Sequence, residues 1–152
     1  MSIFKIREAT LADASAIADI YNHYVRDTTT TFDLNEVSAE EFEHRIAQIQ
    51  KNYPYLVSTL DEQIIGYAYA DQWKAKDAYI QTAETTIYLN PKAHGKGYGL
   101  RLYNALLTAM PLFDLTRSCE VIPEGEFDPE FEKNPCGRCW WCLERKWAFG
   151  RW

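Results

Sequence analysis

The sequence lacks the features of a membrane, secreted or nucleic-acid-binding protein. No apolar run approaches the roughly 20 residues that a membrane span requires, so we expect no membrane partner. The opening stretch, Met1–Thr10, lacks the basic and apolar regions of a signal peptide, and we therefore expect a cytoplasmic protein. Basic residues are also few, since 16 Lys and Arg stand against 22 Asp and Glu and give a net charge of −6. This balance argues against a general nucleic-acid role.

Cysteine is absent from the first 110 residues, and all four cysteines follow residue 118. Four of the five tryptophans follow residue 139. This shift in composition predicts two parts, residues 1–110 and residues 111–152. We expect the boundary near Met110-Pro111, where a helical pattern stops at a proline.

Hydrophobic periodicity in residues 1–110 predicts strands and helices in alternation. The expected elements are a strand at 3–7, a helix at 11–25, a helix that begins near residue 38 and buries Phe42, Ile46 and Ile49, a hairpin of strands at 55–60 and 63–70, a loop at 71–77 and a strand at 78–89. Two capping boxes, Thr10–Asp13 and Ser38–Glu41, mark the helix starts. The order is therefore β-α-α-β-β-β, followed by a glycine-rich loop and a helix.

The glycine-rich turn Gly95–Gly99 lies between the last strand and the last helix. Glycine allows the backbone to turn tightly and to approach a ligand closely. The free N–H groups at a helix N-terminus form an anion site, so this placement predicts a phosphate cradle. The helix that follows is expected to bury one apolar face, formed by Leu100, Tyr103, Leu106, Leu107 and Met110.

Five stretches of residues 3–110 resemble the GNAT N-acetyltransferases, and within them the phosphinothricin acetyltransferase type. They are Ile-Tyr-Asn-His-Tyr-Val (20–25), Gly-Tyr-Ala-Tyr-Ala (66–70), Trp-Lys-Ala-Lys-Asp-Ala-Tyr (73–79), Thr-Ala-Glu-Thr-Thr-Ile-Tyr-Leu (82–89) and His-Gly-Lys-Gly-Tyr-Gly (94–99). The family's pyrophosphate loop reads Gln/Arg-x-x-Gly-x-Gly/Ala. Here His94 takes the first position, and Gly97 and Gly99 take the two small-residue positions.

The resemblance implies a truncated GNAT-type acyl-CoA N-acyltransferase fold, an α/β fold with a mixed sheet and flanking helices. It implies transfer of an acetyl group from acetyl-CoA to the primary amine of a small amino-acid-like molecule. Glu84 matches the family's general base, which is needed because an ammonium group has no lone pair. The alternative is that Glu84 is a solvated strand residue. The residues implied to bind acetyl-CoA are Ile87, Tyr88, Leu89, His94, Gly95, Lys96, Gly97, Tyr98, Gly99 and Leu100.

Four further residues are implied to line the substrate pocket: Phe32, Trp73, Lys74 and Tyr79. Lys74 would bind a substrate carboxylate. The alternatives are that Phe32 and Trp73 belong to the core and that Lys74 is a surface lysine. His23 and His44 lie on predicted helices and are interpreted as surface or half-buried residues.

The family fold continues after the glycine-loop helix with a strand, a helix and two more strands, for which this sequence has no counterpart. The missing strand would form half of the pantetheine cleft. We expect the C-terminal segment, a second subunit in a homodimer or a domain swap to fill the gap. The rival hypothesis is a non-catalytic fusion in which the first part is a scaffold and the second binds a partner, such as nucleic acid.

The cysteines of the second part, Cys119, Cys136, Cys139 and Cys142, include two overlapping Cys-x2-Cys units. Four thiolates make a closed tetrahedral zinc site, so we expect structural Zn²⁺. A cytosolic chain seldom keeps disulfides, which favours a metal over paired cysteines. An iron–sulfur cluster is the other metal alternative.

Residues 111–150 also resemble the C-terminal zinc motif of 7-cyano-7-deazaguanine synthases. The matching residues are Thr116–Cys119, the run from Cys136 to Cys142, Arg145 and Ala148-Phe149. The Ser-Gly-Gly nucleotide motif of those enzymes is absent, so only the metal site is implied. The nearby tryptophans are interpreted as packing around the metal or against the first part; the alternative is that they stack on bases beside the basic residues.

Overall fold

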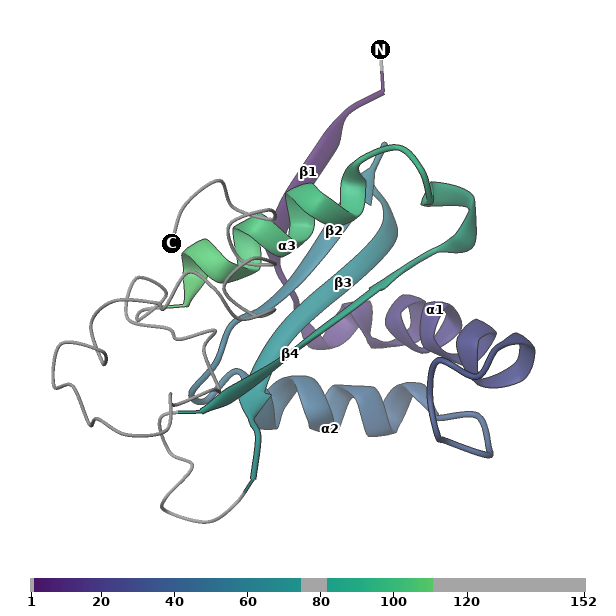
Figure 1. Ribbon diagram of the computed structural model, residues 1–152, viewed down its shortest axis with the longest axis vertical. Helices are drawn as coiled ribbons and strands as arrows, with labels where there is room; N and C mark the ends of the chain where they lie inside the picture. Colours follow the sequence, from purple (N-terminus) through teal and green to yellow (C-terminus); the bar gives the residue numbers. More distant parts are fainter. Residues whose placement is uncertain (1, 75–81, 111–152) are drawn as a thin grey trace, which may run out of the picture. The chain divides into compact units, whose positions relative to one another are not determined.

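The computed structural model describes residues 2–74 and 82–110 (Figure 1). The strands are β1 (Phe4–Glu8), β2 (Tyr55–Leu60), β3 (Gln63–Gln72) and β4 (Ala83–Leu89). The helices are α1 (Ala14–Asp27), α2 (Ala39–Ile49) and α3 (Tyr98–Ala109), with short 3-10 turns at Leu11–Asp13 and Pro91–Ala93. The predicted element order is confirmed.

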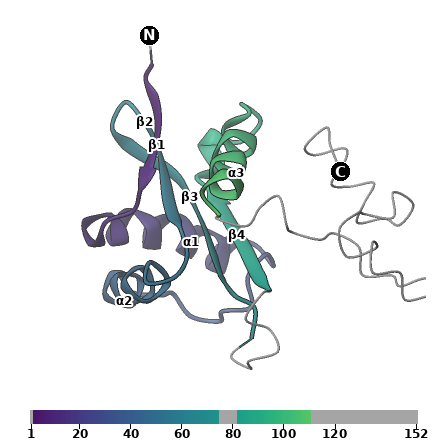
Figure 2. The ribbon, with the colours of Figure 1, turned by 90° about the vertical axis from the view of Figure 1, so that its left-hand side faces the viewer.

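The sheet has the strand order β1-β2-β3-β4, and every neighbouring pair is antiparallel. The family resemblance implies a mixed sheet, but no parallel pair occurs among the described strands. Helices α1 and α2 cover one face and α3 covers the other, as the edge-on view in Figure 2 shows. The described part of the chain is therefore a layered α/β structure, and none of its helices is long and apolar enough to cross a membrane.

Side-chain size alternates along β3 because the two faces of the sheet carry different layers. Tyr67 and Tyr69 point toward α1 and α2, where Tyr67 is 1 % exposed. Ala68 points to the α3 face, where it packs in a cluster with Leu102 and Leu106. Alternate residues of a strand point to opposite faces, so small residues let α3 approach while tyrosines fill the wider layer.

The local signals at the first helix are satisfied by hydrogen bonds. The Asp13 carboxylate accepts from the Thr10 N–H at 2.7 Å and from the Arg7 guanidinium at 2.7 and 2.8 Å. The bond to Arg7 lowers the pKa of Asp13 to about 2. This carboxylate therefore joins β1 to the start of the first helix.

Only one of the two hydrogen bonds of the second capping box forms, and the hairpin turn forms as predicted. Ser38 Oγ accepts from the Glu41 N–H at 3.1 Å, but the Glu41 carboxylate pairs with Arg45. Asp61 and Glu62 have φ of 49° and 66°, which are the positive values of a tight two-residue turn. Together these contacts fix the start of α2 and the register of β2 with β3.

Three boundaries differ from the prediction. β3 continues to Gln72 because its last residues pair with the start of β4, so the loop predicted at 71–77 begins later. Met110 has extended backbone and follows α3 instead of ending its buried face. Leu100 is 59 % exposed, and Leu102 is the fully buried residue of that turn, because the helix begins inside the glycine motif. The segment 78–81 of the predicted strand lies outside the described residues.

Candidate functional site

The glycine-rich loop is shaped by two residues with left-handed backbone. Gly95 has φ of 73°, and Gly97, the N-cap of α3, has φ of 78°. Residues with a side chain rarely adopt these backbone angles, so glycine at both positions permits the turn. The Arg101 N–H donates to the Gly97 carbonyl at 3.3 Å, which is the first turn of the helix. The N–H groups ahead of it have no partner within the helix and form the cradle for an anion.

Gly99 allows the start of α3 to approach the end of β4. A Cβ at Gly99 would lie 3.0 Å from Leu89 Cδ1, which is tighter than an ordinary contact. Tyr98 stacks on Phe4 of β1 at 4.9 Å, with the Arg101 guanidinium 4.1 Å from the Phe4 ring. The Tyr98 side chain therefore anchors the helix, and only its backbone is left for a ligand.

Hydrogen bonds at the two ends of the β3–β4 ladder show which backbone groups face β3. The Asn90 N–H donates to the Ile65 carbonyl at 2.8 Å, and the Trp73 N–H donates to the Thr82 carbonyl at 3.2 Å. Backbone groups alternate sides along a strand, so the even-numbered residues of β4 bond to β3 and the odd-numbered ones face the other edge. No described strand pairs with that edge.

Three residues of β4 are implied by the resemblance to bind the pantetheine arm, and this alternation points their backbone groups to different edges of the strand. The backbone groups of Ile87 and Leu89 face the free edge. Those of Tyr88 are used by β3, where Tyr88 pairs with Tyr67. The prediction that Tyr88 offers its backbone to a ligand is therefore not supported by the ladder, whereas its ring lines a cavity at this edge.

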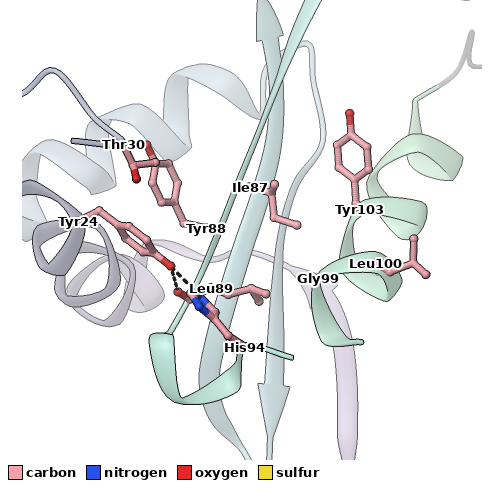
Figure 3. A pocket seen from close by; sticks show the side chains of 9 residues that line it. All are labelled: Tyr24, Thr30, Ile87, Tyr88, Leu89, His94, Gly99, Leu100 and Tyr103. Carbon is pink, nitrogen blue, oxygen red and sulfur yellow. Dashed lines mark hydrogen bonds between the residues drawn. The ribbon is translucent and has the colours of Figure 1, made fainter. Parts of the chain in front are cut away.

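That cavity has a volume of about 470 Å³ and runs beside the free edge of β4 (Figure 3). In Figure 3, Tyr24 and Thr30 lie on one side of the strand, and Leu100 and Tyr103 of α3 lie on the other. The lining consists of Tyr24, Thr30, Ile87, Tyr88, Leu89, His94, Gly99, Leu100 and Tyr103. Five of the residues predicted to bind acetyl-CoA besides Tyr88 are thus brought together: Ile87, Leu89, His94, Gly99 and Leu100.

Tyr24 connects the strand to the glycine loop and was not singled out by sequence reasoning. Its hydroxyl donates to the Leu89 carbonyl at 2.5 Å and lies 2.9 Å from His94 Nε2. A phenol has one proton, and the carbonyl can only accept it. His94 Nε2 must therefore carry a proton and donate to the Tyr24 oxygen. Tyr24 falls in the stretch 20–25 that resembles the family, which was the available signal.

The ammonium group of Lys96 is hydrogen-bonded within the loop. Its Nζ donates to the Lys92 carbonyl at 2.9 Å within the same loop. Gly95 and Lys96 are exposed and do not line the cavity near β4.

Glu84 is exposed and lies on the face of β4 opposite to Ile87 and Leu89. It shares this face with Thr86 and Tyr88 and stands directly across the ladder from Asp71. The carboxylate is therefore accessible from the side of α1 and α2.

The predicted substrate residues are dispersed in the described structure. Phe32 is 98 % exposed and belongs neither to the core nor to the cavity at β4. Trp73 is 45 % exposed, and the Lys74 ammonium lies 4.1 Å from its ring centre. Tyr79 lies outside the described residues, so no pocket formed by all four residues is defined.

The predicted zinc ligands Cys119, Cys136, Cys139 and Cys142 also lie outside the described residues. Within residues 2–74 and 82–110, no group of three or more His, Cys, Asp or Glu side chains could hold a metal ion. The expected metal site therefore remains a prediction from cysteine spacing.

Comparison with known sequences gives a match over the part of the chain described above. The profile of the acetyltransferase (GNAT) domain matches residues 6–111. A phosphinothricin N-acetyltransferase from Streptomyces viridochromogenes is 38 % identical over 106 residues, which are 70 % of this chain and 58 % of that protein. An L-methionine sulfoximine/L-methionine sulfone acetyltransferase from Salmonella typhimurium is 34 % identical, covering 67 % of this chain and 60 % of that protein.

A solved structure shows the same arrangement of elements. A GNAT superfamily phosphinothricin acetyltransferase from Sinorhizobium meliloti, in complex with acetyl-CoA, has a TM-score of 0.66 and 36 % identity. The match covers 69 % of this chain and 58 % of that one. The chain thus spans about three-fifths of the length of these relatives.

Proposed function

Because the chain belongs to the GNAT acetyltransferase domain family, we propose that it transfers an acetyl group from acetyl-CoA to the primary amine of a small amino-acid-like molecule. The observation that carries this proposal is the glycine loop at the head of α3, open beside the free edge of β4. The names of two relatives, which act on phosphinothricin and on methionine sulfoximine or sulfone, support an acceptor of amino-acid type.

Acetyl-CoA fits the described residues at both ends of the cavity. The amides of Gly97–Leu100 at the head of α3 would hold its pyrophosphate. The backbone of Ile87 and the N–H of Leu89 face the free edge, where the pantetheine arm would add as a strand. The Leu89 carbonyl already accepts from Tyr24, so it is a positioned acceptor rather than a free one. Bound acetyl-CoA supplies the activated acetyl group.

Glu84 is the proposed general base. A substrate ammonium has no lone pair, so the carboxylate takes its proton, directly or through a water. The neutral nitrogen then bonds to the acetyl carbon as the carbon–sulfur bond breaks, and the departing thiolate takes up the proton that this nitrogen releases. The exposure of Glu84 on a strand that also offers the free edge supports this role.

Titration calorimetry with acetyl-CoA, followed by an amine screen, tests the proposal. We expect saturable micromolar binding and turnover of amino-acid substrates. Glu84→Gln should lower kcat about 100-fold or more while leaving acetyl-CoA binding nearly unchanged. Glu40→Gln, on the exposed surface of α2, is the matched control. Full activity of Glu84→Gln would exclude it as the base, and absence of acetyl-CoA binding would favour the non-catalytic scaffold.

We also propose that residues 111–152 bind structural Zn²⁺ through Cys119, Cys136, Cys139 and Cys142. The support is their spacing, which suits a tetrahedral thiolate site. Metal analysis of the purified protein should find about one zinc per chain, and Cys139→Ser should lower that content. A zinc content unchanged by this substitution would contradict the assignment. Light scattering on the same samples tests the predicted homodimer.

A further inference from the structure

A second cavity, with a volume of about 330 Å³, lies between α2 and β3. It is separate from the glycine loop and shares no lining residue with the cavity at β4. Its lining residues are His44, Arg45, Gln48, Ile49, Tyr69 and Asp71. Tyr69 and Asp71 lie on the same face of the sheet as Glu84, so this cavity adjoins the proposed general base.

The α2 wall of this cavity carries an oriented cation. Arg45 Nε donates to Glu41 Oε1 at 2.9 Å, and the guanidinium lies 5.2 Å from the centre of the Phe42 ring. Among the described residues, no hydrogen bond uses the two terminal nitrogens of Arg45. A guanidinium held at Nε with free terminal N–H groups is suited to bind a carboxylate.

The strand wall carries the carboxylate of Asp71, and Glu84, which does not line the cavity, lies across the ladder from it. Asp71 and Glu84 are partners in the β3–β4 ladder, and both are exposed. Their pair has the same parity as the hydrogen-bonded pairs at the ends of the ladder, in which opposite Cα atoms lie about 5.5 Å apart. Like charges directly opposite each other in a sheet are destabilising, and no ion pair within the described part of the chain neutralises either one. A bound cation would remove this repulsion.

A buried polar atom behind the cavity also lacks a partner. Tyr55 stacks on Tyr69 with ring centres 4.9 Å apart, and the Tyr55 hydroxyl is the buried side-chain atom without a hydrogen bond among the described residues. Burial raises the pKa of Tyr55, while the charge of Arg45 acts in the opposite direction. A buried hydroxyl without a partner is costly, but Tyr55 is 1 % exposed and does not line the cavity, so a ligand there would contact Tyr69 and not this hydroxyl.

We propose that this cavity binds the acceptor amino acid as a zwitterion, with its carboxylate on Arg45 and its ammonium between Asp71 and Glu84. The inference rests on the proposed acetyl transfer and adds the site and the required charge pattern of the acceptor. Glu84 takes the ammonium proton, and Asp71 holds the amine beside it. A simple amine without a carboxylate loses the contact with Arg45 and is a poorer substrate.

The test compares L-methionine sulfone with its decarboxylated amine, 3-(methylsulfonyl)propylamine. Arg45→Met should raise KM for the amino acid roughly 10- to 100-fold, because a charged hydrogen bond is lost, and change KM for the amine by less than about 3-fold. Asp71→Asn should raise KM for both substrates, because both carry the ammonium. The matched control is Arg26→Met, whose arginine pairs with Glu36 away from this cavity and should leave both values unchanged.

Calorimetric titration of L-methionine sulfone, with CoA present, separates this inference from the proposed function. Binding to the wild type that is lost in Arg45→Met supports the site even if no turnover occurs. Absence of binding to the wild type, or equal binding to both proteins, overturns it. Turnover of the amino acid with unchanged KM in Arg45→Met would overturn the site and leave the acetyltransferase function standing. Thermal melting confirms that each variant is folded.

Discussion

The two faces of β4 differ in chemistry although they belong to one short strand. Thr85, Ile87 and Leu89 face α3, and Ile87 and Leu89 pack in a cluster with that helix. Glu84 and Tyr88 face α1 and α2, where Tyr88 joins a layer of tyrosine rings. Strand alternation thus places aliphatic side chains against α3, and the proposed base and the charged cavity on the side of α1 and α2, while the cavity at the strand edge is lined from both sides.

This division gives the two faces of the sheet different kinds of packing. The aliphatic face is close-packed, so the position of α3 and its anion cradle is fixed by shape. The tyrosine face has polar tips and a wider layer, so it leaves room for charged side chains such as Arg45 and Asp71. Substitutions can break the close packing, the tyrosine layer and the contact that joins the two sides, with effects that decrease in that order.

Gly66→Ala should cause the largest loss of stability because it breaks the close packing on the α3 side. A Cβ at Gly66 would lie 2.3 Å from Leu89 Cδ2 and 2.9 Å from the Tyr88 carbonyl oxygen. Overpacking of this kind lowers the free energy of unfolding by about 2–3 kcal/mol, measured by urea denaturation.

Gly95→Ala is the control for that measurement. Gly95, unlike Gly66, has a positive φ, and an added Cβ there would meet nothing within 4 Å. Its replacement should cost about 1 kcal/mol through backbone strain alone. If Gly66→Ala were no worse than Gly95→Ala, close contact between β3 and the end of β4 would not be what holds this face.

The tyrosine face should lose stability in alkali. Burial among other tyrosine rings raises the pKa of Tyr88 to about 12, from an ordinary value of 10.0, and burial raises that of Tyr67 as well. The unfolded chain ionises first, so this stabilisation is complete below pH 10 and is lost as pH rises toward 12. Between pH 10 and 11 the wild type should lose on the order of 1 kcal/mol more than Tyr88→Phe, measured by guanidinium unfolding. Tyr88 would not be the group that titrates if both proteins lost the same free energy of unfolding between pH 10 and 11. The same would follow if their free energies of unfolding already changed differently with pH between pH 7 and 8.

Most of the fold could be predicted from the sequence because its signals are local. The capping residues, the positive-φ turn at Asp61-Glu62 and the alternation of β3 and β4 each depend on neighbouring residues. The errors occurred where tertiary contacts decide: β3 extends because β4 pairs with it, and Leu100 is exposed because α3 begins within the glycine motif.

The candidate site could be predicted only in part. The glycine loop is visible in the sequence because the positive φ angles at these positions require glycine. Tyr24 and Arg45 were not identified, because each acts through a residue far away in sequence: Tyr24 contacts Leu89, and Arg45 shares a cavity with Asp71. The direction of the Tyr88 backbone groups depends on which residues of β4 hydrogen-bond to β3, and the sequence alone does not reveal this.

Tyr24→Phe should have the smallest effect, because it removes one hydroxyl that joins the two sides at the end of β4. The variant leaves the Leu89 carbonyl and His94 Nε2 without this partner. The ring remains, with Tyr24 and Tyr88 centres 5.0 Å apart, so stability should fall by only about 1 kcal/mol. Because the hydroxyl positions both the strand edge and the loop, we expect acetyl-CoA to bind roughly 5-fold more weakly by calorimetry.

A double-mutant cycle with His94→Gln determines whether Tyr24 acts through the loop. Residues in one hydrogen-bond network have non-additive effects, so the double variant should bind acetyl-CoA little worse than Tyr24→Phe alone. Thr108→Val, which removes a hydroxyl bonded to the Asn104 carbonyl on α3 outside the cavity lining, is the control and should leave binding unchanged. Strictly additive losses would mean that Tyr24 and His94 contribute separately. The hydroxyl would then stabilise the strand edge alone, and the two sides of β4 would be coupled only through the packing of the sheet.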